Sequence, residues 1–99
     1  NGRNGMIFTQ NGVMNLRNKK WENDFTELDP CGTSFVDHHY TKAYVRHLIH
    51  AQEMLGLEIL SIHNLAFYLW LVGEARKHIL AGDFKSWKDE IIPRLMQRM

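Results

Sequence analysis

The stretch Ser61–Ala81, SIHNLAFYLWLVGEARKHILA, most constrains what this chain can fold into. Its first half is apolar all round the expected helix, so that helix must be covered on more than one side. The apolar run 65–72 is shorter than the roughly 20 residues that a membrane-spanning helix needs. We therefore expect a core helix that begins at the capping residue Ser61 and ends before Gly82. Since 99 residues offer little material to wrap it, we expect a partner surface, either the rest of a larger domain or a second copy.

Charge is segregated along the chain although the net charge is only +1. That balance excludes the strongly basic class of nucleic-acid-binding proteins as a property of the whole chain. Residues 1–20 nevertheless carry basic side chains and no acidic one, and these are Arg3, Arg17, Lys19 and Lys20. They could hold a phosphate backbone or form an ordinary solvated surface, and composition leaves both open. Cys31 is the single cysteine, which excludes an internal disulfide and favours a reducing compartment.

The first third of the chain predicts a β-hairpin followed by a loop. Two short β-prone runs, 6–9 and 13–16, flank Asn11-Gly12, a dipeptide typical of a type I′ turn. Residues 17–34 have no clear period and are punctuated by Asp29-Pro30 and Gly32, so we expect a loop with a short strand near Trp21.

A second helix is expected over 39–55, ending at Gly56. It carries a stripe at helical spacing: Tyr40, Tyr44, His47, Leu48, Ala51, Met54 and Leu55. The stripe could be intramolecular core or a partly wet interface. Other side chains lie away from its middle: Lys42, Arg46, His50 and Glu53.

The remaining segments complete an α+β fold class. Residues 57–60 are interpreted as a short apolar link, and a last helix is expected over 84–98, capped by Asp83 and kinked or interrupted by Pro93. The expected organisation is therefore a hairpin and loop over 1–38, followed by three helices over 39–99.

Residue spacing alone identifies no activity. The six histidines form no HExxH motif and no Cys/His set, so spacing does not indicate a metal site. Nothing local supports Cys31 as a nucleophile, and the loop carboxylates Asp24, Glu27 and Asp29 are expected to be solvated. A free-standing RNA-binding or dimerisation module without catalysis therefore remains a candidate.

Several segments, taken together, resemble the tRNA-guanine transglycosylases (queuine tRNA-ribosyltransferases). They are Arg3-Asn4-Gly5 with MIFT, Gly12 with NLRN over 15–18, Leu28-Asp29-Pro30, YTKAYVRHL over 40–48, EMLG over 53–56 and IHNL over 62–65. Each motif alone is weak, but they cover nearly the whole chain in order and in spacing.

The resemblance implies that the chain is the C-terminal quarter of a cytoplasmic enzyme with a (β/α)8 barrel and no membrane association. Family members exchange guanine at the tRNA wobble position for a 7-deazaguanine, preQ1 or queuine, in queuosine biosynthesis. One aspartate attacks the ribose C1′ carbon and a second handles protons. Both lie before residue 1 in this frame, so no catalytic residue is expected here and the chain alone should be inactive.

The resemblance also assigns binding residues. By the resemblance, Arg3 is expected to contact the anticodon loop. Arg17, Lys19 and Lys20 are not matched to family residues, and their expected tRNA contact comes from the basic charge of residues 1–20. The family's homodimer helix matches positions of the aromatic stripe. The dimer contacts are therefore expected at Tyr40, Tyr44, His47 and Glu53.

The family's zinc knuckle, C-x-C-x2-C plus a histidine, is degenerate in this chain. Its cysteines fall on Gly32, Ser34 and Asp37, and only His63 remains. Because structural zinc takes four close donors, we expect no metal cofactor. Packing by Phe35 and Val36 and an Asp37–His63 hydrogen bond would replace it. The alternative is a metal held by a different set: Cys31, Asp37, His38 and His63.

Overall fold

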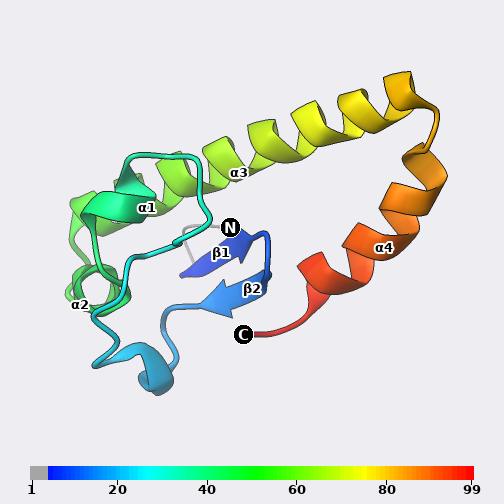
Figure 1. The fold of residues 1–99 in the computed structure, drawn as a ribbon. Coiled ribbons are helices and arrows are strands. Elements are labelled where there is room, and N and C mark those ends of the chain that lie inside the picture. The colour runs from blue at the N-terminus through cyan, green and yellow to red at the C-terminus, as the bar shows by residue number, and fades with distance from the viewer. Residues whose placement is uncertain (1–4) are drawn as a thin grey trace.

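The computed structural model describes residues 5–99, which form a two-stranded hairpin covered by helices (Figure 1). The elements are β1 (Met6–Thr9), β2 (Gly12–Asn15), a 3-10 turn η2 (Lys19–Trp21), α1 (Val36–His39), α2 (Lys42–His50), α3 (Met54–Ala81) and α4 (Phe84–Met96). Helix α3 crosses the molecule, and α4 returns from its far end toward β2 (Figure 1). The α+β class and the hairpin are confirmed. Arg3 lies outside the described residues.

The hairpin pairs β1 with β2 antiparallel, with Ile7 opposite Met14. The expected type I′ turn is wrong. That turn needs a positive φ at Asn11, whereas Gln52 is the one non-glycine residue with a positive φ among those described. Gly12 has a φ of +136°, and a Cβ there would overlap the carbonyl oxygen of Gln97. The glycine is therefore needed for close approach of the C-terminal segment rather than for the turn itself.

Both edges of the hairpin are covered. On the β2 side, Val13 N donates to Gln97 O at 2.8 Å and Met99 N donates to Val13 O at 2.9 Å. On the β1 side, Asn64 of α3 accepts from Phe8 N at 3.2 Å. Because a bare strand edge is a template for pairing with other chains, these bonds protect both edges, and the Asn64 bond also fixes α3 to the sheet.

One apolar cluster lies where the hairpin, the loop, α2 and the start of α3 meet. Trp21 belongs to this cluster. The strand expected near Trp21 is instead the 3-10 turn η2, whose i→i+3 hydrogen bonds turn the chain so that the indole faces inward. The buried members are Ile7, Met14, Leu16, Trp21, Leu28, Val36, Val45, Leu48, Ile49, Ile59 and Leu60. Residues from both sides of position 38 therefore share one core.

The boundary between α2 and α3 differs from the expectation. Helix α2 ends at His50, and Gln52 adopts the left-handed conformation with φ of 58°. Gly56, the expected stop, lies inside α3, where a Cβ would stand 2.9 Å from Leu48 Cβ. The glycine thus permits the close approach of α2 and α3. Likewise, the expected link 57–60 is helical, and Ser61 is an exposed mid-helix residue rather than a cap.

Helix α3 is longer than expected, with 28 residues. By length and composition it could cross a membrane, a test that core helices of soluble proteins also pass. The short 65–72 run therefore does not by itself exclude a membrane span. His63 and Asn64, near the middle of the helix, bond to the hairpin backbone, which is the behaviour of a core helix.

The end of α3 and the start of α4 form a tight corner. Gly82 ends α3 with φ of +81°, as expected. The Asp83 side chain makes no capping hydrogen bond to α4. Its carboxylate instead accepts a hydrogen bond from His78 Nδ1 at 2.8 Å. The His78 ring stacks on Trp87 with ring centroids 4.8 Å apart. Pro93 does not interrupt α4, which continues to Met96.

Candidate functional site

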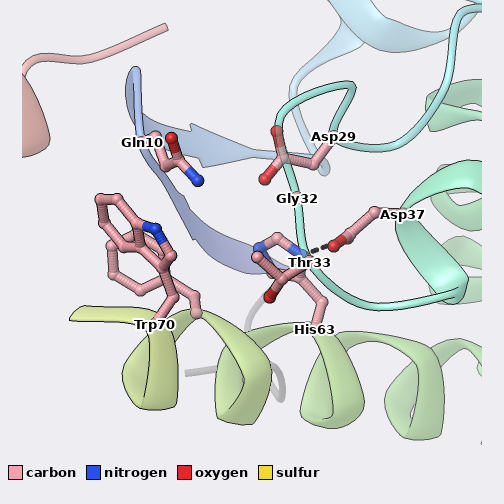
Figure 2. Close-up of a pocket in the computed structure, with 8 residues that line it drawn as sticks. Gln10, Asp29, Gly32, Thr33, Asp37, His63 and Trp70 are labelled. Atoms are coloured by element: carbon pink, nitrogen blue, oxygen red, sulfur yellow. Dashed lines mark hydrogen bonds and ion pairs between the residues drawn. The ribbon is translucent and has the colours of Figure 1, made fainter. Parts of the chain in front are cut away.

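A buried polar cluster lies between β1, the loop before α1, α1 itself and the N-terminal half of α3. It consists of Asp29, Asp37 and His63, which are only 3%, 1% and 1% exposed. Figure 2 shows Asp37 reaching His63, which rises from α3, while Asp29 and Gly32 lie on the loop above. Three segments far apart in the sequence thus meet at one point.

His63 is fixed by two hydrogen bonds. Its Nδ1 bonds to Asp37 Oδ1, as expected from the sequence, and its Nε2 bonds to the Phe8 carbonyl at 2.8 Å. A carbonyl oxygen only accepts, so Nε2 carries a proton. The second oxygen of Asp37, Oδ2, accepts from Ser34 N at 3.1 Å. The predicted Asp37–His63 hydrogen bond is confirmed.

Charge and burial act in opposite directions on this pair. Burial by itself lowers the pKa of His63, but the hydrogen bond to Asp37 and the charge of that carboxylate outweigh it, so the pKa is raised. The pairing therefore favours the protonated ring, whose two N–H groups would donate to the Asp37 carboxylate and to the Phe8 carbonyl. A charge buried in this way is tolerable only when it is paired.

Asp29 belongs to the cluster, although the sequence predicted a solvated carboxylate. Burial is the main cause of its raised pKa, and the positive charge of His63 opposes that rise. Asp29 Oδ1 accepts from Cys31 N at 3.2 Å, and Asp29 N donates to Asp37 O at 3.3 Å. The apolar Leu28 beside it, which is fully buried, is the local signal that could have indicated an inward-facing loop.

Of the remaining residues proposed around the degenerate knuckle, one is buried and three are exposed. Val36 is buried as expected, but Phe35 is 69% exposed, so its predicted packing role is wrong. Cys31 is exposed. His38 is exposed as well, and its ring nitrogens contact Glu27 Oε1 at 3.1 Å and a backbone carbonyl at 2.9 Å.

The donors available for a metal are therefore few. Among residues 5–99, the His, Cys, Asp and Glu group with ligand atoms within 4.8 Å of one another is Asp29, Asp37 and His63. The alternative set with Cys31 and His38 is not brought together there. A closed structural zinc site takes four donors, so these three residues do not complete one.

The expected tRNA contacts lie at the opposite end of the hairpin from its turn. Arg17, Lys19 and Lys20 are all exposed, and the two lysines belong to η2. Lys20 Nζ stands 4.7 Å from the centroid of the Trp21 ring. The structure thus gathers three exposed cations around one turn, while the fourth, Arg3, lies outside the described range.

The expected dimer contacts are partly rearranged. Tyr40 precedes α2 in extended conformation and stacks on Tyr44 with centroids 5.8 Å apart; Tyr44 is 43% exposed. His47 is exposed on α2, whereas Glu53 is not on that helix and instead precedes α3. Leu48, predicted on the same stripe, is buried in the core. Tyr44 and His47 therefore face solvent while Leu48 faces inward.

Lys42, which the sequence pattern placed away from the middle of the aromatic stripe, is buried. It is only 6% exposed. Its Nζ donates to the Glu27 carbonyl at 2.6 Å and to Thr26 Oγ1 at 3.0 Å. The lysine thus ties α2 to the preceding loop.

Comparison with known proteins agrees with the resemblance found in the motifs. The profile of the family described as Queuine tRNA-ribosyltransferase matches residues 1–97. The queuine tRNA-ribosyltransferase of Aquifex aeolicus (strain VF5) is 37% identical over 99 residues, which is 100% of this chain and 26% of the relative. Those of Lactococcus lactis subsp. cremoris (strain SK11) and Clostridium acetobutylicum are 40% and 42% identical over 93% and 91% of the chain, and 24% of each relative. The chain spans about a quarter of the length of these curated relatives.

Proposed function

Because the chain belongs to the queuine tRNA-ribosyltransferase family, we propose that it is the C-terminal part of a cytoplasmic tRNA-guanine transglycosylase. The complete enzyme exchanges guanine at the anticodon wobble position for a 7-deazaguanine, preQ1 or queuine. A (β/α)8 barrel in the preceding part supplies the catalytic aspartates. The chain alone is then inactive, and its role is to support tRNA and the homodimer.

The outer face of α3 is the observation that carries this proposal. One side of α3 bonds to the hairpin through His63 and Asn64. The other side exposes large apolar residues, with Leu65, Tyr68 and Leu69 each 60% exposed. Contiguous apolar surface of this kind marks a contact with another protein surface. Since the relatives are about four times as long, the preceding part of the enzyme is the natural cover.

The tRNA contacts are assigned to the cations around η2. Arg17, Lys19 and Lys20 are exposed near one turn, where they can neutralise phosphates of an anticodon stem-loop. Binding of this kind is electrostatic and weakens as salt rises. Phosphate contacts position the RNA without reading its sequence, so base recognition is left to the preceding part.

The homodimer contact is assigned to the exposed aromatic side of α2. Tyr44 and His47 are exposed on α2, the half-buried Tyr40 just before the helix stacks on Tyr44, and Glu53 follows the helix. Tyrosines suit an interface because they bury a large ring while keeping a polar group available.

A chimaera tests the proposal. The corresponding quarter of the Aquifex aeolicus relative is replaced by this chain, and incorporation of labelled guanine into tRNA is measured. We expect incorporation by the chimaera and none by the chain alone. Incorporation by the chain alone, or a folded chimaera without incorporation, contradicts the proposal. A chain that by itself binds a tRNA anticodon stem-loop as tightly as the chimaera does supports a free-standing RNA-binding module instead.

A further inference from the structure

The four positions of the family's knuckle converge on one carboxylate. A Cβ built at Gly32 would overlap Asp37 Oδ2 and stand 2.8 Å from Asp37 Cβ. Ser34 N donates to Asp37 Oδ2, and His63 bonds to Asp37 Oδ1. The Asp37 side chain therefore fills the space of a Cβ at position 32 and bonds to the backbone of position 34 and to the ring at position 63.

The side-chain donors at the four knuckle positions already have protein partners, and Asp29 adds only one further carboxylate to the cluster. Both ring nitrogens of His63 and both oxygens of Asp37 already have protein partners. The Ser34 hydroxyl accepts from Val36 N at 3.3 Å. Gly32 has no side chain. A structural zinc ion needs four deprotonated or neutral donors free to bind it, so the residues present do not fit that ion.

We propose that the Asp37 carboxylate stands in the place of the metal, and that its bonds to His63 and to the loop hold α1, β1 and α3 together without any ion. Gly32 is then required because Asp37 occupies the space of any side chain at 32. The backbone positions still surround one point. Cysteines at 32, 34 and 37 together with His63 should therefore bind zinc.

The metal content of the unaltered chain is the first test. The chain is produced in zinc-supplemented medium, and zinc is measured by elemental analysis. We expect far less than one ion per chain and a thermal midpoint that a chelator does not change. One zinc per chain, removed by the chelator with a fall in the midpoint, overturns the proposal.

The triple variant Gly32→Cys/Ser34→Cys/Asp37→Cys tests the convergence. Refolded with zinc, it should hold one ion per chain, and cobalt should give the absorption of a tetrahedral thiolate site. Adding His63→Ala should weaken zinc binding by at least tenfold, because one of the four ligands is then lost. A triple variant with native circular dichroism that binds no zinc shows that the four positions do not converge.

A pair of glycine substitutions keeps the proposal testable if the cysteine variant does not fold. Gly32→Ala should lower the thermal midpoint by more than about 4 °C, because its Cβ meets Asp37. Gly73→Ala, a matched control in α3 with nothing within 4 Å of its Cβ, should not lower it. The Gly32→Ala loss should disappear in an Asp37→Ala background. A loss of equal size in both backgrounds overturns the steric link between Gly32 and Asp37.

Discussion

Truncating Leu65 to alanine should have different consequences in the isolated chain and in the complete enzyme. Leu65 is 60% exposed on the outer face of α3. In the chain alone, truncation removes mainly solvated surface and should change the free energy of unfolding by no more than about 0.5 kcal/mol. Full burial of a leucine side chain is worth roughly 1.5–3 kcal/mol. The exposed 60% therefore leaves roughly 1–2 kcal/mol to be gained when the preceding part covers it.

Urea unfolding of the chain and of the Aquifex aeolicus chimaera, each with and without Leu65→Ala, measures this difference. The substitution should cost roughly 1–2 kcal/mol more in the chimaera than in the chain. Ile59→Ala is the matched control, because Ile59 is 1% exposed and should cost about 2–5 kcal/mol in both proteins. Equal, small effects of Leu65→Ala in both proteins, beside large effects of the control, refute the inference that this face is covered.

Three further predictions concern the surface. Tyr44→Ala should weaken self-association of the chimaera in sedimentation, since it removes the ring that stacks on its neighbour at the proposed interface; an unchanged dimer contradicts that assignment. Lys19→Ala/Lys20→Ala should weaken binding of a tRNA anticodon stem-loop and reduce the salt-dependence slope by about 2; an unaltered slope removes both lysines from the contact. Glu27→Gln should lower the pKa of His38 in an NMR titration, because the hydrogen bond to Glu27 is the main cause of its raised pKa. The stability that this pair supplies is present below about pH 6.5 and is lost as pH rises through the raised pKa; identical titration curves contradict the pairing.

Local chemistry predicted much of the fold. Asn11-Gly12 between two β-prone runs predicted the hairpin, and Gly82 marked the end of α3 where the left-handed residue is found. The hairpin and the end of α3 depend on residues close in sequence. The Asp37–His63 bond came instead from the resemblance to the family's zinc knuckle, together with the rule that a buried carboxylate needs a partner, and the structure contains it.

The start of α3 could not be predicted in this way. Ser61 has capping chemistry, but nothing in the sequence showed that Gly56 packs on Leu48 and that the helix continues back to Met54. Packing between helices decided the boundary, and it overrode the local signal. The same holds for Gly12, where a glycine is needed because the backbone of the distant Gln97 lies against it.

The burial of Lys42 and Asp29 was missed for a related reason. Each is charged, and charged residues are usually solvated. Burial of Lys42 is tolerated because the Glu27 carbonyl accepts a hydrogen bond from its ammonium group. Burial of Asp29 is tolerated because the charge of His63 and a backbone N–H of the loop stabilise its carboxylate. Such partners are 15 or more residues away for the lysine, so spacing along the chain does not reveal them.

The coupling between Asp37 and His63 is the measurement that tests the central claim most directly. Unfolding free energies are measured for the unaltered chain, Asp37→Asn, His63→Gln and the double variant, all in buffer containing a chelator. The account predicts a coupling energy of at least about 1.5 kcal/mol, as expected for a buried charge-assisted hydrogen bond. A coupling energy indistinguishable from zero would contradict the claim that this pair, without a metal, holds α1 to α3.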